Sequence, residues 1–205
     1  MSKALLLRGG RLVTMDGARR IVDADVLVED GLIKKVGRSD GRTVGRSRPA
    51  TIDCHGLVVL PGLVQAHIHL CQTLFRGLAD DLTLEDWLAQ RIWPLEAAHT
   101  EDSVYASAML GAAELLLGGT TAILDMETVR HTGAAFEALK EIGIRATAGK
   151  CLMDAPSNPA GLRESTDKAL SESADLCARW HGAAGGRLRY CFAPRFAPSC
   201  TGPLL

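Results

Sequence analysis

The 205-residue sequence has no long apolar run and no long run of like charge. No segment approaches the ~18 consecutive apolar residues that span a membrane, and only four apolar residues separate Lys3 from Arg8, too few for the core of a signal peptide. We therefore expect a cytoplasmic protein that makes no membrane contact.

Basic and acidic side chains are nearly balanced, with 23 Lys and Arg against 24 Asp and Glu. No Lys/Arg run provides the electrostatic footprint of a nucleic-acid-binding protein, so no nucleic-acid partner is expected. Residues 37–49 are locally basic, but their Gly and Ser content predicts a solvated loop.

The six cysteines form no C-x-x-C pair and show no short spacing of the kind found in disulfide-rich domains. We expect reduced thiols, mostly buried. With 47% hydrophobic and 23% charged residues, the chain has the composition of an ordinary globular protein that can bury a sizeable core.

Residues 1–60 contain short apolar runs separated by Gly and Asp, which predict a small β module with strands at 4–8, 11–14, 25–28, 32–36 and 51–54. The Asp30-Gly31 pair between two of these runs fits a type I′ hairpin turn. The pattern changes after residue 57, and we expect a domain boundary near Leu60-Pro61.

Residues 61–205 alternate between strand-like and helical segments, the pattern of β/α units around a parallel sheet. Strands are predicted at 63–69, 120–126, 144–152 and 188–194, and helices at 83–92, 100–117, 132–142 and 165–181. The fold class is therefore α/β with four β/α units, about half of a closed eight-stranded barrel, which typically needs ~250 residues.

The tripeptide His67-Ile68-His69 ends the first of these strands. Side chains alternate along a strand, so both imidazoles point the same way at the carboxyl end, where barrel active sites lie. An H-x-H pair alone is a weak metal motif. Here it ends an almost wholly apolar strand preceded by Pro61-Gly62, where two buried imidazoles need a partner, and we interpret it as half of a metal site.

Residues 60–69 resemble the first barrel strand of the amidohydrolase superfamily. Residues 74–82, Trp87-Leu88 and residues 92–96 narrow the resemblance to the branch that contains methylthioadenosine/S-adenosylhomocysteine deaminases, related nucleoside deaminases and triazine hydrolases. The chain would be the N-terminal half of such an enzyme. The resemblance implies a distorted (β/α)₈ TIM-like barrel preceded by a small β-sandwich module, which C-terminal strands complete.

The resemblance also implies one divalent metal ion, Zn²⁺ or Fe²⁺ with Zn²⁺ favoured, held in part by His67 and His69. In the family the other ligands and a glutamate general acid/base come from later strands, so we expect no catalytic acid/base here and no activity from these 205 residues alone. The implied reaction of the full-length protein, a homo-oligomer, is hydrolytic deamination of an amino-substituted purine nucleoside or related small N-heterocycle by a metal-bound hydroxide.

Several substrate-binding residues follow from the same resemblance. Glu96 matches the carboxylate that holds the ribose hydroxyls in nucleoside deaminases, and Trp87 either packs against a substrate ring or belongs to the core. Lys150 and Arg195 stand where those enzymes usually carry an arginine and a histidine. Arginine prefers a carboxylate, phosphate or carbonyl-rich ring, so Arg195 leaves the identity of the substrate open, and Lys150 would reinforce the binding of an anion or oxo group. Alternatively, Lys150 and Arg195 both cap strand ends at the surface.

Three further polar residues lie near the predicted metal pair. Asp125 and Glu127 share a face at the end of the second strand, and we expect them to hydrogen-bond the metal-binding histidines from behind or to bind a basic substrate group. Gln72 follows the pair closely and is expected to touch substrate. The other four histidines are interpreted as non-ligands.

Two alternatives to deamination of a nucleoside remain open. The first is triazine-type hydrolytic dechlorination or deamination, which would release chloride or an amine. The second is a catalytically inert fragment that lacks the later metal ligands, since half a barrel leaves open strand edges.

Overall fold

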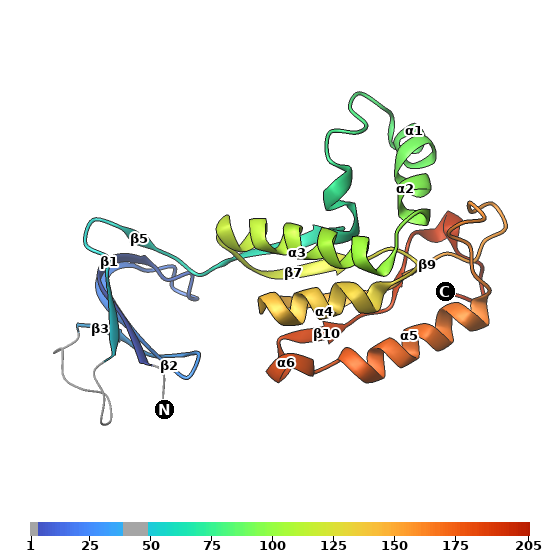
Figure 1. Cartoon of the computed structure of the whole chain (residues 1–205). Coiled ribbons are helices and arrows are strands. Elements are labelled where there is room, and N and C mark those ends of the chain that lie inside the picture. The colour runs from blue at the N-terminus through green and yellow to red at the C-terminus, as the bar shows by residue number, and fades with distance from the viewer. Residues whose placement is uncertain (1–3, 39–48) are drawn as a thin grey trace. The chain divides into compact units, whose positions relative to one another are not determined.

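The computed structural model describes residues 4–38 and 49–205, so most of the predicted basic loop at 37–49 lies outside the described residues. The chain divides into two compact units, Met1–Pro61 and Gly62–Leu205, shown in Figure 1. In the part of the chain that is described, no helix has the length and apolar character to cross a membrane. The six cysteines are unpaired, and four of them are buried.

The described residues of the first unit form one sheet of five strands. β1 pairs with β2 in antiparallel fashion and with β4 and β5 in parallel, and β2 pairs with β3. The strands are β1 (Ala4–Val13), β2 (Ile21–Glu29), β3 (Leu32–Gly37), β4 (Ala50–Asp53) and β5 (Val58–Val59). Within the described residues this unit has one sheet, so the predicted sandwich is not confirmed.

Two local features of this sheet follow from its sequence. The predicted strands at 4–8 and 11–14 form one strand, β1. Its ladder with β2 shifts register around Gly9, which has a φ of +73°. Glycine tolerates this bulge conformation, and β1 continues through it. Asp30 and Gly31 both have positive φ, as the predicted type I′ hairpin turn between β2 and β3 requires.

The second unit contains a parallel sheet with strand order β10-β8-β7-β6. Its strands are β6 (Leu63–Ile68), β7 (Thr120–Met126), β8 (Arg145–Gly149) and β10 (Leu188–Tyr190). Two predicted strands are broken in the structure, because β8 is followed after Lys150 by β9 (Cys151–Leu152), and β10 is followed by β11 (Ala193–Pro194), which pairs with β9. At the break a Cβ on Gly149 would lie 2.0 Å from the carbonyl oxygen of Cys191, so this close approach requires glycine.

Three long helices cover one face of this sheet (Figure 1). They are α3 (Glu101–Leu117), α4 (Thr132–Ile142) and α5 (Thr166–Trp180), close to the predicted ranges. Thr100 caps α3 in a capping box with Ser103, and Ser165 caps α5. Phe136 of α4 stacks between Trp180 and Tyr190 in the core. The opposite face of the sheet exposes apolar side chains such as Val64 and Leu124.

The segment between β6 and α3 approaches the carboxyl ends of the strands. It contains the 3₁₀ helix η1 (Leu70–Phe75) and then a continuous helical run, longer than the predicted 83–92. That run consists of α1 (Leu84–Trp87), the π-helical turn η2 (Leu88–Ile92) and α2 (Trp93–Ala97). Pro94 directly follows the π-helical turn, as the second residue of α2, and the helical run continues through it past the predicted end. The remaining short elements are α6 (Ala183–Gly186) and η3 (Ala197–Ser199).

Candidate active site

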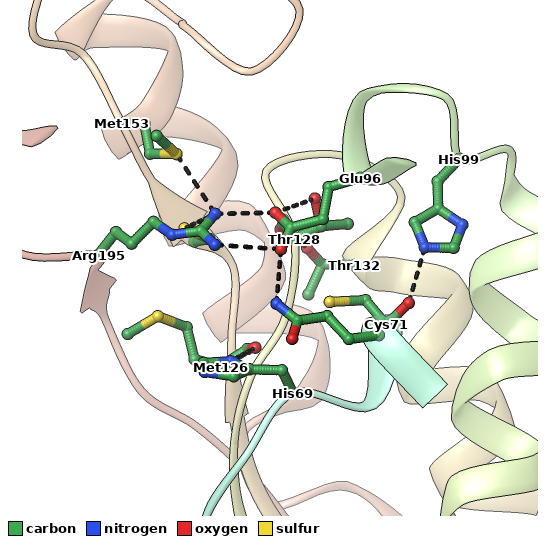
Figure 2. Close-up of polar contacts among 11 residues, drawn as sticks. His69, Cys71, Glu96, His99, Met126, Thr128, Thr132, Met153 and Arg195 are labelled. Atoms are coloured by element: carbon green, nitrogen blue, oxygen red, sulfur yellow. Dashed lines mark hydrogen bonds and ion pairs between the residues drawn. The ribbon is translucent and has the colours of Figure 1, made fainter. Parts of the chain in front are cut away.

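The two histidines of the H-x-H motif lie side by side at the carboxyl end of β6. Their ring centroids are 4.9 Å apart and the rings meet edge to face. Nδ1 of His69 lies 2.8 Å from the carbonyl oxygen of Met126 (Figure 2). Because a carbonyl only accepts, Nδ1 must carry the hydrogen, which leaves the lone pair of Nε2 on His69 free to bind a metal.

The histidine pair fits a divalent metal ion as part of a ligand set. Zinc sites in enzymes use three protein ligands or more. Among the described residues, no group of three or more His, Cys, Asp and Glu side chains is close enough to hold a metal. The two imidazoles could supply two of the ligands that such an ion needs.

A pocket of about 520 Å³ opens beside His69. Gln72 from η1 and Trp87 from α1 also line it, so three of the predicted site residues face one cavity. His67 lines a second pocket of about 330 Å³ with Asp125, Met126 and residues of the β10–β11 segment. The histidine pair thus lies between two cavities, the larger of which extends along α3 to Thr120 at the start of β7.

Glu96 and Arg195 form a buried ion pair at this edge of the sheet, and Figure 2 shows the two side chains pointing toward one another. The guanidinium is bidentate, with Nη1 2.8 Å from Oε2 and Nη2 3.1 Å from Oε1 of Glu96. Gln72 Nε2 donates to Oε1 at 2.8 Å, and Thr128 Oγ1 donates to Oε2 at 3.3 Å. Burial acts to lower the pKa of Arg195, but the hydrogen bonds and charge of Glu96 outweigh it and raise that pKa.

This arrangement corrects one expectation from the sequence. Glu96 and Arg195 were expected to bind different parts of a substrate, and the structure pairs them with each other. The pairing joins residues 99 positions apart, from α2 and from the turn after β11. Arg195 is not a surface cap, since its side chain is only 8% exposed, and that of Glu96 is 1% exposed.

Lys150 was expected beside Arg195 as a second cation for the substrate, and the structure contradicts this. Its side chain is fully buried, and Nζ lies 2.6 Å from Glu164 and 3.2 Å from Glu172. It also donates to the carbonyl oxygen of Val129. The ammonium is therefore committed to a buried ion cluster, because a charge without solvent needs such partners.

Asp125 and Glu127 are buried at the carboxyl end of β7. Asp125 Oδ1 accepts from the backbone N–H of Leu70 at 3.0 Å, which anchors η1 directly after His69. The hydrogen-bond partner of His69 is the Met126 carbonyl between these two acids, rather than either carboxylate. Burial, and then the neighbouring charge of Asp125, raise the pKa of Glu127 well above its ordinary value, which favours its protonated form.

The structure also adds two residues that the sequence did not indicate. Thr128 contacts Glu96, and the buried His99 bridges Cys71 and Ser103, with Nε2 2.8 Å from the Cys71 carbonyl oxygen (Figure 2). Burial lowers the pKa of His99, which keeps this imidazole neutral. A single threonine or histidine carries no local signal for such contacts, so only the fold reveals them.

The fold agrees with comparisons with known proteins. The Amidohydrolase family model matches residues 58–205, and the chain belongs to that family. It is 40% identical over 202 residues to a 5-methylthioadenosine/S-adenosylhomocysteine deaminase of Syntrophobacter fumaroxidans. This match covers 98% of the present chain and 44% of the relative.

Solved structures show the same relationship. Escherichia coli guanine deaminase is 28% identical, with a TM-score of 0.84 over 98% of this chain and 49% of that protein. An atrazine chlorohydrolase of Arthrobacter aurescens TC1, solved with zinc, is 26% identical, with a TM-score of 0.88 over 98% of this chain and 48% of that protein. The chain spans less than half the length of the curated relatives it matches.

Proposed function

We propose that the whole protein containing this chain is a metal-dependent hydrolase that removes an amino group from a small N-heterocycle. The observation that carries the proposal is the tautomer of His69, set by the Met126 carbonyl, which leaves Nε2 free beside His67. The pocket next to this pair supports a small ring substrate, because Gln72 offers an amide and Trp87 an aromatic face. Similarity to curated deaminases supports the reaction class.

In this proposal the described residues supply the first part of the site. The ion they help to hold, zinc by analogy with the similar chlorohydrolase, would acidify a water and supply hydroxide at neutral pH. His67 and His69 bind that ion, Gln72 and Trp87 contact the ring, and Asp125 holds the backbone after His69 in place. The four β/α units are the first half of an eight-stranded barrel, whose other half provides the remaining ligands and the proton-transferring acid.

A second candidate is hydrolytic dechlorination of a triazine. It is favoured by the high structural similarity to the atrazine chlorohydrolase, and it would use the same pair of metal-binding histidines. The two reactions differ in the leaving group, so the product identifies which one occurs.

The test uses the full-length protein, purified and analysed for bound metal. We expect about one Zn²⁺ or Fe²⁺ per chain, lost in the His67→Ala/His69→Ala variant and retained in His55→Ala, an exposed histidine of the first unit. Ammonia release from amino-substituted purines and pyrimidines would support deamination, and chloride release from a chlorotriazine would support the second candidate. Full metal retention in the double variant would refute the assigned ligands.

A further inference from the structure

The carboxylate of Glu96 has no capacity left for a substrate. A carboxylate offers about four lone-pair positions. In the structure four donor groups occupy them: two from Arg195 and one each from Gln72 and Thr128. A ribose diol donates two O–H groups and needs an acceptor such as a free carboxylate, which Glu96 does not provide.

Burial makes this occupation durable. The Glu96 side chain is 1% exposed and that of Arg195 is 8% exposed, so neither charge can turn toward water once the pair is broken. Opening a buried bidentate pair leaves two uncompensated charges, which is strongly unfavourable. A sugar would therefore compete poorly with Arg195 for this carboxylate.

Among the described residues, two other acids line the pocket beside His69, and neither replaces Glu96. Glu114 is held by Arg76 in a bidentate pair, at 2.7 and 2.9 Å. Asp80 lies on the exposed connection between η1 and α1, where a hydrogen bond to a sugar competes with water. Gln72, a neutral amide, is the group through which the Glu96–Arg195 pair reaches the pocket.

We infer that the Glu96–Arg195 pair makes this protein selective for a free heterocyclic base over the corresponding riboside. The inference rests on the proposed deaminase function and narrows its substrate class. Arg195 determines specificity through the carboxylate it occupies. The nucleoside expected from the sequence resemblance is then the disfavoured substrate.

The experiment compares matched pairs, adenine with adenosine and guanine with guanosine, using the full-length metal-loaded protein. We expect kcat/KM for ammonia release to favour a base over its riboside by about tenfold or more, the discrimination that buried polar groups can give. Calorimetric binding of the same four compounds should show the same preference. Binding does not require turnover, so it tests the selectivity even if no ammonia is released and the deaminase proposal fails.

Three variants test the role of Arg195. Arg195→His removes the bidentate partner of Glu96 and should raise the ratio of kcat/KM for the riboside to kcat/KM for the base by about tenfold. Glu96→Gln/Arg195→Gln replaces the charged pair with neutral amides and should keep the base preference. Arg179→His, which alters the exposed ion pair of Arg179 with Glu137, is the matched control and should leave the ratio unchanged.

Wild-type preference for the ribosides, in turnover or in binding, would overturn the inference. So would an unchanged ratio in folded Arg195→His protein. If that variant does not fold, the wild-type binding comparison decides. Riboside turnover abolished by Asp80→Asn would also refute the inference, because it would show that an exposed acid holds the sugar.

Discussion

Replacing Lys150 with methionine tests how strongly the buried carboxylate of Glu164 depends on its ammonium partner. Lys150 follows β8, and its ammonium lies between Glu164, which is 2% exposed, and Glu172, which is 39% exposed. Methionine has a similar length and no charge, so the change removes the ammonium with little loss of packing. The carboxylate of Glu164 then loses its closest partner.

Removing one partner of a buried ion pair costs about 3–5 kcal/mol, because the other charge stays buried without compensation. Lys168 lies 3.3 Å from the other oxygen of Glu164 and is 62% exposed, so it retains a small part of the compensation. Exposed pairs contribute about 0–1 kcal/mol, so we expect the free energy of unfolding to fall by about 2–4 kcal/mol in Lys150→Met.

The assay is urea unfolding of the full-length protein, followed by the fluorescence of its tryptophans, which include the buried Trp180. Lys168→Met is the matched control, since it removes the exposed partner of the same carboxylate and should cost at most about 1 kcal/mol. Adding Glu164→Leu to Lys150→Met should recover stability, because it removes the orphaned charge. Equal losses in Lys150→Met and Lys168→Met would refute the reasoning.

Three further predictions concern stability. Gly149→Ala should lower the free energy of unfolding by about 1–3 kcal/mol in urea unfolding, because its Cβ would press on the Cys191 carbonyl; an unchanged midpoint would contradict this. Glu127→Gln should stabilise the protein increasingly as pH rises above 4.5, since the raised pKa of Glu127 lets the unfolded state release a proton first; a gain equal at pH 4 and pH 8 would exclude this cause. His99→Gln should reduce the loss of stability below pH 6.5, because the lowered pKa of His99 makes the unfolded state bind a proton first. Parallel plots of the free energy of unfolding against pH for the two proteins would argue against this.

Much of the secondary structure of both units could be predicted because its signals are local. Thr100 and Ser165 mark helix starts by capping, and Asp30-Gly31 marks a turn by its conformational freedom. The strand-and-helix alternation follows from apolar periodicity, which depends only on near neighbours. The H-x-H motif is also a local signal, because side chains two residues apart on one strand point to the same face.

Other features depend on approach between distant segments. Nothing near Lys150 in the sequence shows that its amine turns toward Glu164, and the strand break beside it depends on the Cys191 carbonyl passing Gly149. The strand pattern of the first unit likewise shows that one face is apolar and not what covers it, so the predicted sandwich stays a prediction.

The sequence by itself determined the family, the order of the elements and the histidine pair, because each depends on residues close together in the chain. The tertiary structure decided what the remaining charges do. Glu96 and Arg195 are 99 residues apart, and only folding brings them to one edge of the sheet. Once buried there without water, each charge needs the other, so the two side chains expected to bind a substrate bind one another.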